Sequence, residues 1–225
     1  MQFKNSAPAI RLSHSSAVLH VDERGVETLA QHFRETGWLR LPLLFEAPLL
    51  ERVMRWLDEG DFREVTHDDM GGDTELVLQD CVASRSLELL HNNETLFQLL
   101  EEVTDCGRIG SFVGRTYRFL PNSGHGYAWH SDMADTRLLG FSLNLSRKPY
   151  LGGQLQLRQL DAPESCQDVI NTSVGDAVIF TISEHMEHRV QQVTGLHPKT
   201  AYAGWFCREP DFRRRISPYL ESASD

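Results

Sequence analysis

"LLGFSLNLS", residues 138–146, alternates in character and places Leu139, Phe141, Leu143 and Leu145 on one face. Such alternation predicts a strand with one buried face, because successive side chains of a strand point to opposite sides of the sheet. The segments around it also read as short strands separated by turns: "SFVGRTYRFL", "GGQLQLRQL", "VINTSVGDAVIFTI", "HRVQQV" and "TAYAGWFCRE". Short strands without intervening helices predict antiparallel sheets in a sandwich, barrel or jelly roll.

The first half of the chain reads mainly as helical. One helical pattern follows Asp22, a residue type that caps helices, and stops at Gly37. Further patterns lie in "LLERVMRWL", "SRSLELL" and "ETLFQLLEEV", the last ending at Gly107. Between the first two, "WLRLPLL" is a predicted strand. The polar residues 61–82 are a predicted loop, of which residues 61–80 are a candidate lid over the site.

These patterns predict one domain over residues 1–225. We expect a mainly β fold with flanking helices, in which residues 1–110 are a helical support and residues 111–210 are the β core. The helices would pack on the outside of one sheet. The length of 225 residues is sufficient for a buried core without disulfides or a structural metal.

Composition excludes some classes of function. A net charge of −10 argues against a nucleic-acid partner, which would require a basic face, and "FRRR" at residues 212–215 is interpreted as solvated surface. The four cysteines are scattered without a Cys-x-x-Cys pair, so free thiols in a reducing compartment are expected. No stretch resembles a signal peptide or a membrane span. We therefore expect a cytoplasmic protein without a membrane partner, and the sequence leaves the oligomeric state open.

Three His-x-Asp triplets are candidates for a metal site. The first, His20-Val21-Asp22, lies at a predicted helix start, where capping explains the aspartate. The second begins at His67 in the polar loop, and no strand follows to supply another ligand. The third, His130-Ser131-Asp132 in "GYAWHSDMAD", opens the β-rich half. Residues i and i+2 of a strand point the same way, so His130 and Asp132 offer two ligands together.

A non-haem iron site requires two imidazoles and one carboxylate on one face of the metal. The second histidine must come from a distant strand, and "EHMEHRVQQV" offers His185 and His188. We favour His188 because it begins a strand-like segment, and His185 is the alternative. Zinc-protease patterns, which place two histidines around a glutamate on one helix, do not fit this segment.

With these residues the sequence resembles the 2-oxoglutarate- and iron(II)-dependent oxygenases, in particular their prolyl-hydroxylase-like branch. The resemblance extends from about Ser111 to Arg208. Four pieces carry it in the right order: "LPNSGHGYAWHSD", "FSLNLSRKPYLGGQLQLR", "VGDAVIF" and "HRVQQVTGLHPKTAYAGWF". The upstream "HFRETGWLRLPLLFEAPLLERVMRWL" is similar to the helix–strand–helix segment that often precedes them.

The resemblance implies a double-stranded β-helix, which is a cupin-like jelly roll, with Fe(II) bound by His130, Asp132 and His188. No catalytic residue beyond these metal ligands is expected. It also implies that O2 and 2-oxoglutarate are consumed, that succinate is formed and that a C–H bond is hydroxylated, with ascorbate as a possible reductant. Related halogenases have a small residue where this chain has Asp132, so halogenation is disfavoured.

The same resemblance implies residues that contact the co-substrate. Lys199 stands six residues before Trp205, where this branch usually has an arginine that pairs a buried carboxylate. Arg118 is a candidate for the polar role of a tyrosine that the branch often has on the strand before the motif, since Leu120 stands at the counted position. Ser142 and Asn144 share a strand face and are expected to look toward the co-substrate. Tyr127 matches a tyrosine near the substrate mouth.

Three functional classes remain open from the sequence. The first is an oxygenase acting on a free amino acid, a peptide or protein side chain, or a natural-product intermediate. The second is a non-catalytic jelly-roll module that binds a metal or ligand. The third is a cupin-like metalloenzyme that does not use 2-oxoglutarate. Lys199 beside a complete ligand set favours the first.

Overall fold

The structure is a computed structural model that describes residues 7–67, 73–169 and 172–210. The basic run at residues 212–215 therefore lies outside the described residues. These described ranges contain four α-helices: α1 (Glu23–Thr36), α2 (Ala47–Asp58), α3 (Val82–His91) and α4 (Glu94–Thr104). Their positions confirm the helical patterns of the sequence. Asp22 caps α1 by accepting a hydrogen bond from the Gly25 N–H, and Gly37 ends it in the left-handed conformation.

The strands form two large antiparallel sheets that face each other. The major sheet has the order β3 (Trp38–Leu41), β12 (Ala177–Thr181), β8 (Arg137–Asn144), β15 (Lys199–Cys207), β6 (Ser111–Phe119), β5 (Asp73–Leu78), β4 (Phe62–His67). The minor sheet has the order β11 (Gln167–Val169), β10 (Leu155–Gln159), β13 (Met186–Val190), β7 (Tyr127–His130). This mainly β arrangement is the predicted jelly roll.

Two short pairs complete the fold. The first joins β1 (Ile10–Leu12) to β2 (Ala17–Leu19), and the second joins β9 (Leu151–Gly152) to β14 (Val193–Thr194). Residues 163–165 form a single 3₁₀ turn. The strands β1 and β2 were not among the elements predicted from the sequence.

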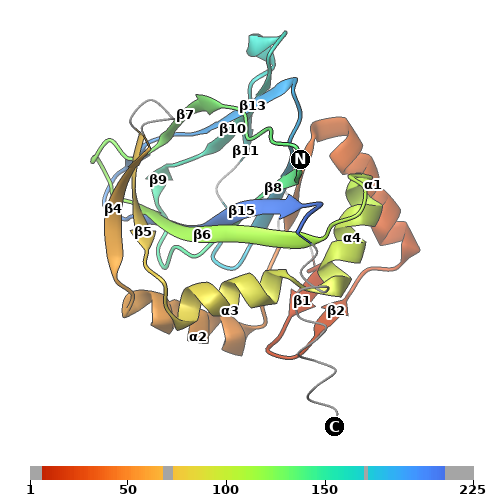
Figure 1. The fold of residues 1–225 in the computed structure, drawn as a ribbon, viewed down its shortest axis with the longest axis horizontal. Coiled ribbons are helices and arrows are strands. Elements are labelled where there is room, and N and C mark those ends of the chain that lie inside the picture. The colour runs from red at the N-terminus through yellow and green to blue at the C-terminus, as the bar shows by residue number, and fades with distance from the viewer. Residues whose placement is uncertain (1–6, 68–72, 170–171, 211–225) are drawn as a thin grey trace.

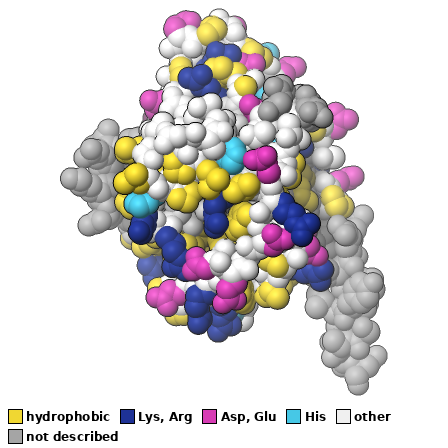
Figure 2. Space-filling model, turned by 90° about the vertical axis from the view of Figure 1, so that its left-hand side faces the viewer, with side chains coloured by type: hydrophobic (Ala, Val, Ile, Leu, Met, Phe, Trp, Pro, Cys, Tyr) yellow, Lys and Arg dark blue, Asp and Glu magenta, His cyan; other side chains and the backbone are white. Residues whose placement is uncertain are grey.

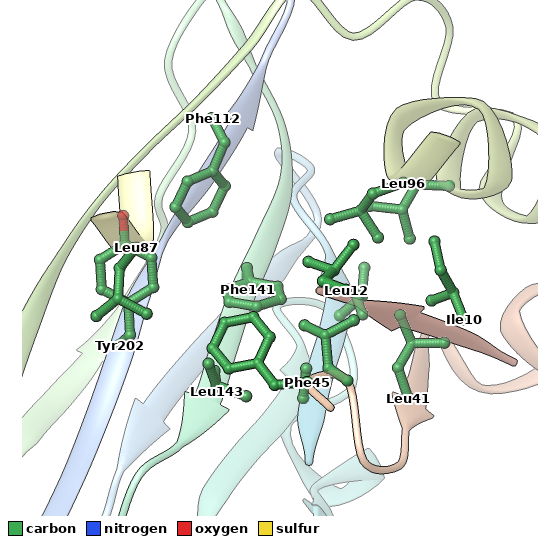
Figure 3. Close-up of a cluster of buried hydrophobic side chains, with 14 of the residues drawn as sticks. Ile10, Leu12, Leu41, Phe45, Leu87, Leu96, Phe112, Phe141, Leu143 and Tyr202 are labelled. Atoms are coloured by element: carbon green, nitrogen blue, oxygen red, sulfur yellow. The ribbon is translucent and has the colours of Figure 1, made fainter. Parts of the chain in front are cut away.

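The helices cover the outer face of the major sheet, as predicted. In Figure 1, α2 and α3 lie beneath this sheet, and α1 and α4 lie at one end of it. On β8, Leu139, Phe141 and Leu143 are buried in the cluster that also contains the apolar faces of the helices. Figure 3 shows part of this cluster, with Leu87 of α3 on the side of Tyr202 and Leu96 of α4 on the side of Ile10 and Leu12.

A second apolar cluster lies between the two sheets. Its members come from both large sheets and from the short strand β14: Tyr117, Phe119, Leu155, Leu157, Val169, Val178, Phe180, Val190, Val193 and Ala201. The alternation of the major-sheet strands therefore separates two environments. One face of each strand packs against helices, and the other faces the interior of the jelly roll.

Residues 61–82 correct one expectation. The described residues of this range are not mainly a loop, because Phe62–His67 and Asp73–Leu78 pair as an antiparallel hairpin at the edge of the major sheet. Its strand β4 has exposed or half-buried side chains on both faces, which explains why it lacks the alternation of a half-buried strand. The strands β3, β4 and β5 all lie within residues 1–110, which were predicted to be a helical support. They nevertheless belong to the major sheet. In Figure 1 the hairpin rises from the major sheet toward β7.

His91 generates a prediction about stability. It is fully buried among aromatic rings, and its Nδ1 lies 2.7 Å from the Leu87 carbonyl oxygen. Burial lowers the pKa of His91 from 6.5 to about 4. The unfolded chain therefore binds one more proton than the folded chain between these pH values. The free energy of unfolding falls as the pH falls through that window, by about 3 kcal/mol for this group.

Chemical denaturation at several pH values measures this effect. We expect the His91→Leu variant to have a flatter dependence of the free energy of unfolding on pH between 4 and 6.5. A slope equal to that of the unsubstituted protein would contradict the assignment to His91.

Candidate metal centre

Two neighbouring strands bring the three expected ligands together. The antiparallel pairing of β7 with β13 places His130 opposite His188, and their rings lie 4.2 Å apart. Asp132 follows β7 by two residues. Its carboxylate oxygens lie 3.3 Å from Nε2 of His188 and 3.8 Å from Nε2 of His130. One potential ligand atom of each residue lies within 4.8 Å of the others. The three side chains would therefore be able to hold a single ion between them.

Within the described residues, no other group of histidine, cysteine, aspartate and glutamate side chains is as compact. Asp22 serves as the cap of α1, as the sequence suggested. His67 contacts the buried carboxylate of Glu75, with 2.7 Å between Nε2 and Oε1. Asp69, its partner in the second triplet, lies outside the described residues.

The structure brings His188 to the centre and leaves His185 outside it. His188 is 9% exposed, whereas the side chain of His185 is 78% exposed and its Nε2 lies 3.4 Å from a Glu184 carboxylate oxygen. The strand β13 explains why His188 and not His185 lies at the centre. His188 lies within β13, whose direction the sheet fixes, whereas His185 precedes the strand.

The protonation states of His130 and Asp132 suit metal binding. Burial, with the neighbouring His188, lowers the pKa of His130, which favours the neutral imidazole. Nδ1 of His130 lies 2.8 Å from the Ala128 carbonyl oxygen, so Nε2 remains available for an ion. Burial alone would raise the pKa of Asp132, but hydrogen bonds from His188 and Trp205 outweigh it and hold the pKa at about 2. Neutral imidazoles and an ionised carboxylate are the forms that bind metals.

The centre opens into a cavity of about 670 Å³ between the two sheets. Tyr127 and Ser142, two of the expected contacts, line it, and Lys199 lies at its inner end. The other lining residues combine apolar walls with charged groups: Leu155, Phe180, Val190, Ala203 and Trp205 together with His67, Asp73, Arg115 and Arg137. Figure 2 shows the face on which the hairpin lies, where hydrophobic side chains gather with charged side chains around them.

Lys199 is the first residue of β15 and is 6% exposed. Its ammonium group donates a hydrogen bond of 2.8 Å to the Gly153 carbonyl and lies about 6 Å from the rings of Tyr117 and Tyr150. Burial lowers the pKa of Lys199 to about 7. The ion pairs found in the described part of the chain do not include Lys199. A buried cation without a carboxylate is a position for an acidic ligand.

Two other expected contacts lie close to Lys199. Ser142 lines both the main cavity and a small pocket beside it, and Asn144 lines that small pocket. The Asn144 amide donates to the Thr172 carbonyl at 2.6 Å, and its oxygen accepts from the Ser146 N–H at 2.9 Å. Asn144 therefore holds two loop segments in place beside the cavity.

Arg118 was expected to contact the co-substrate, but it lies on the opposite face of β6 from the cavity. Its guanidinium packs over the Phe62 ring at 3.9 Å and donates to the Thr200 hydroxyl. The neighbouring Tyr117 lines the cavity instead. The alternation of the strand places these adjacent residues on opposite sides, so counting back from His130 across the turn at 121–126 selected the wrong face.

Tyr127 lines the cavity, and its hydroxyl donates to the Glu75 carboxylate. Glu75 is fully buried and also accepts hydrogen bonds from Arg115, at 2.8 Å from Nε. Sequence reasoning missed Glu75 because the hairpin was taken for a loop, and without Glu75 nothing singled out Arg115 on the strand β6. The signal that could have identified the hairpin is Gly71-Gly72 between two runs of equal length.

Arg137 was also missed. It lies over the Trp205 ring at 3.6 Å and donates to the Asp132 backbone carbonyl at 3.1 Å. Its guanidinium is 3.6 Å from the Asp132 carboxylate. It therefore holds the segment that carries one of the three ligands.

The comparison with known families agrees with this geometry. Residues 115–207 match the model described as the 2OG-Fe(II) oxygenase superfamily, and all three ligands lie within the match. These residues are a 2OG-Fe(II) oxygenase domain. The matched residues are those of a 2-oxoglutarate-dependent dioxygenase, with Fe(II) as its metal and 2-oxoglutarate as its co-substrate.

Solved structures share the fold of this oxygenase. A 2OG-Fe(II) oxygenase-family oxidoreductase from Burkholderia pseudomallei is 19% identical, with a TM-score of 0.66 over 86% of this chain and 95% of that one. A prolyl hydroxylase from Trichoplax adhaerens, in complex with a peptide of hypoxia inducible factor, is 17% identical, with a TM-score of 0.60 over 86% and 92%.

The epimerase SnoN, in complex with Fe3+, alpha ketoglutarate and nogalamycin RO, is 15% identical, with a TM-score of 0.59 over 83% and 84%. At these identities the likeness concerns the fold. Curated protein sequences gave no match. Among the described residues of the oxygenase, no helix is both long and apolar enough to cross a bilayer.

Substitution of the ligands tests the metal centre. We expect His188→Ala to weaken Mn²⁺ binding by at least about 100-fold, because it removes one of three protein ligands. His185→Ala is the matched control, since this exposed histidine precedes His188 by three residues and should leave binding unchanged. Isothermal titration of the metal-free protein measures both. Equal loss in the two variants, or none in His188→Ala, would contradict the assignment.

Proposed function

We propose that this oxygenase hydroxylates an unactivated C–H bond of an amino acid, a peptide or protein side chain, or a natural-product intermediate, with decarboxylation of 2-oxoglutarate to succinate. The observation that supports it best is the buried Lys199 in the same cavity as His130, Asp132 and His188. A metal centre alone would fit many enzymes. A metal centre with a buried cation that lacks a carboxylate fits a dicarboxylate co-substrate.

The roles of the residues follow from their positions. His130, Asp132 and His188 would hold Fe(II). Lys199 would pair with the carboxylate of 2-oxoglutarate that lies away from the metal, and Tyr117 and Ser142 line the wall beside it. When bound, the iron and 2-oxoglutarate supply the activation of O2 and the oxidising equivalents for C–H cleavage.

The cavity walls have a separate task. Leu155, Phe180 and Val190 line the region beside His188 and limit the access of water to it. An apolar wall strengthens the pairing of Lys199 with an acid, because electrostatic interactions are stronger where water is excluded. The deep end of the cavity would thus hold the co-substrate, and the mouth near Tyr127, Arg137 and Trp205 would receive the substrate.

The substrate classes are supported by the fold neighbours and by the size of the cavity. One neighbour was solved with a peptide and another with nogalamycin RO. A cavity of about 670 Å³ accommodates a small molecule or a single side chain beside the co-substrate. We further propose one domain over residues 1–225 and a location in the cytoplasm, which the four free cysteines support.

Succinate formation tests the proposed function. With Fe(II), ascorbate and O2, the protein should convert 2-oxoglutarate to succinate slowly, and a metabolite or peptide panel should contain compounds that accelerate it. Asp132→Ala should abolish both reactions while the far-ultraviolet circular dichroism stays unchanged. Metal binding without 2-oxoglutarate binding would favour a cupin-like metalloenzyme. Binding of both without turnover for any compound would favour a non-catalytic module.

Lys199 generates a further prediction. Lys199→Ala should weaken 2-oxoglutarate binding to the Mn²⁺-loaded protein by at least about 100-fold and leave Mn²⁺ binding unchanged, because a charged hydrogen-bonded pair in a buried site contributes several kcal/mol. Lys148→Ala, at an exposed lysine of the nearby loop, is the control. Equal affinities of the two variants for 2-oxoglutarate would contradict the role of Lys199.

The pH dependence of binding follows from the same residue. The pKa of Lys199 is about 7 without an acidic ligand, and pairing with a carboxylate raises it. At pH 8 most molecules therefore take up a proton when 2-oxoglutarate binds, and the affinity falls as the pH rises above 7. Titration calorimetry in buffers with different ionisation enthalpies measures the uptake. No uptake at pH 8 would contradict this prediction.

A further inference from the structure

The strand that ends at His130 contains an irregularity. The register pairs His130 with His188, and the next pair is Tyr127 with Val190. Between these pairs β13 has one residue and β7 has two, so β7 contains a β-bulge that includes Ala128. A bulge disrupts the ladder locally and reorients the backbone of the longer strand. The backbone groups of Ala128 therefore need partners other than β13.

Both backbone groups of Ala128 have such partners. Its N–H donates to the carboxylate of Asp73 at 2.8 Å. Its carbonyl oxygen lies 2.8 Å from Nδ1 of His130. Two hydrogen bonds thus connect Asp73, through the backbone of the single residue Ala128, to the imidazole of the proposed ligand His130. The second bond fixes the proton on Nδ1 and leaves Nε2 free for the metal.

A second contact ties the same strand to the hairpin. Glu75 lies two residues after Asp73 on β5, so the two side chains leave the strand on the same side. Its carboxylate accepts a hydrogen bond from the hydroxyl of Tyr127, the residue before Ala128. The side chain of Glu75 is fully buried, and Arg115 compensates its charge at 2.7 Å.

The hairpin that supplies these carboxylates lies outside the matched residues 115–207. It extends the edge of the major sheet, whereas β7 is the edge of the minor sheet. Figure 1 shows β4 and β5 reaching from one sheet to the other. The hairpin therefore bridges the two sheets at the strand that delivers the first metal ligand.

We propose that Asp73 and Glu75 are positioning residues that hold the bulged strand β7 so that Nε2 of His130 faces the metal. The inference rests on the proposed role of His130 as a ligand. Asp73 acts on the peptide of Ala128, and Glu75 acts on the side chain of Tyr127. Neither carboxylate is a ligand itself, because neither belongs to the compact group formed by His130, Asp132 and His188.

The test compares substitutions that keep or remove the acceptor. Asp73→Asn keeps an oxygen that can accept from the Ala128 N–H, and Asp73→Ala removes it. We expect Asp73→Ala to weaken Mn²⁺ binding by about 10- to 100-fold, the usual effect of losing an outer partner of a ligand, and Asp73→Asn to restore most of it. Tyr127→Phe, which keeps the ring and removes the hydroxyl, should weaken binding by a smaller factor. Asp80→Ala is the control, because this exposed carboxylate beyond β5 pairs with Arg85.

A second readout does not depend on metal or turnover. In the metal-free protein, two-bond ¹⁵N–¹H correlations of the imidazole should show the proton of His130 on Nδ1, and Asp73→Ala should shift it toward Nε2. Thermal unfolding identifies a variant that merely loses its fold. If the unsubstituted protein binds Mn²⁺ and Asp73→Ala binds it equally well with an unchanged tautomer, the inference is overturned. If the unsubstituted protein binds no metal, the proposed function fails first.

Discussion

The pairing of β7 with β13 is the constraint on which the site depends. His130 and His188 are separated by nearly sixty residues of chain, and this antiparallel register places their rings 4.2 Å apart. Asp132 then needs only the two residues after His130 to reach the same point. A shift of either strand by one residue would turn one imidazole to the other face of the sheet and destroy the set. The rest of the fold keeps this register in place.

The interior of the jelly roll adds the second part of the chemistry. The inner face of β15 begins with Lys199 and continues with small residues, Ala201 and Ala203, toward Trp205. The small side chains leave space over the floor of the cavity, and the lysine gives its inner end a positive charge. Its neighbours Tyr117 and Tyr150 are largely buried. The three candidate metal ligands and this ammonium group therefore line one shared cavity.

The sequence contained enough to predict the fold class and the three side chains that the structure brings together as candidate ligands. Alternation in residues 138–146 predicted the buried face of β8, and the order His130, Asp132, His188 predicted the centre. The prediction from sequence failed where a strand lacked a clear alternation of apolar and polar residues. The edge strand β4 has polar side chains on both faces, so the hairpin read as a loop, and Asp73 and Glu75 were missed with it. Arg118 was assigned to the cavity because counting cannot locate a strand face across a turn of undetermined shape.

We propose that a single cavity holds a divalent metal on His130, Asp132 and His188 and an acid on Lys199. A crystal structure of the protein with Mn²⁺ and 2-oxoglutarate tests it most directly, because anomalous scattering locates the metal independently of the fold. We predict one anomalous peak bounded by the three side chains and a carboxylate within hydrogen-bonding distance of the Lys199 ammonium. A metal bound elsewhere, or a 2-oxoglutarate molecule that leaves Lys199 bonded only to Gly153, would contradict the claim.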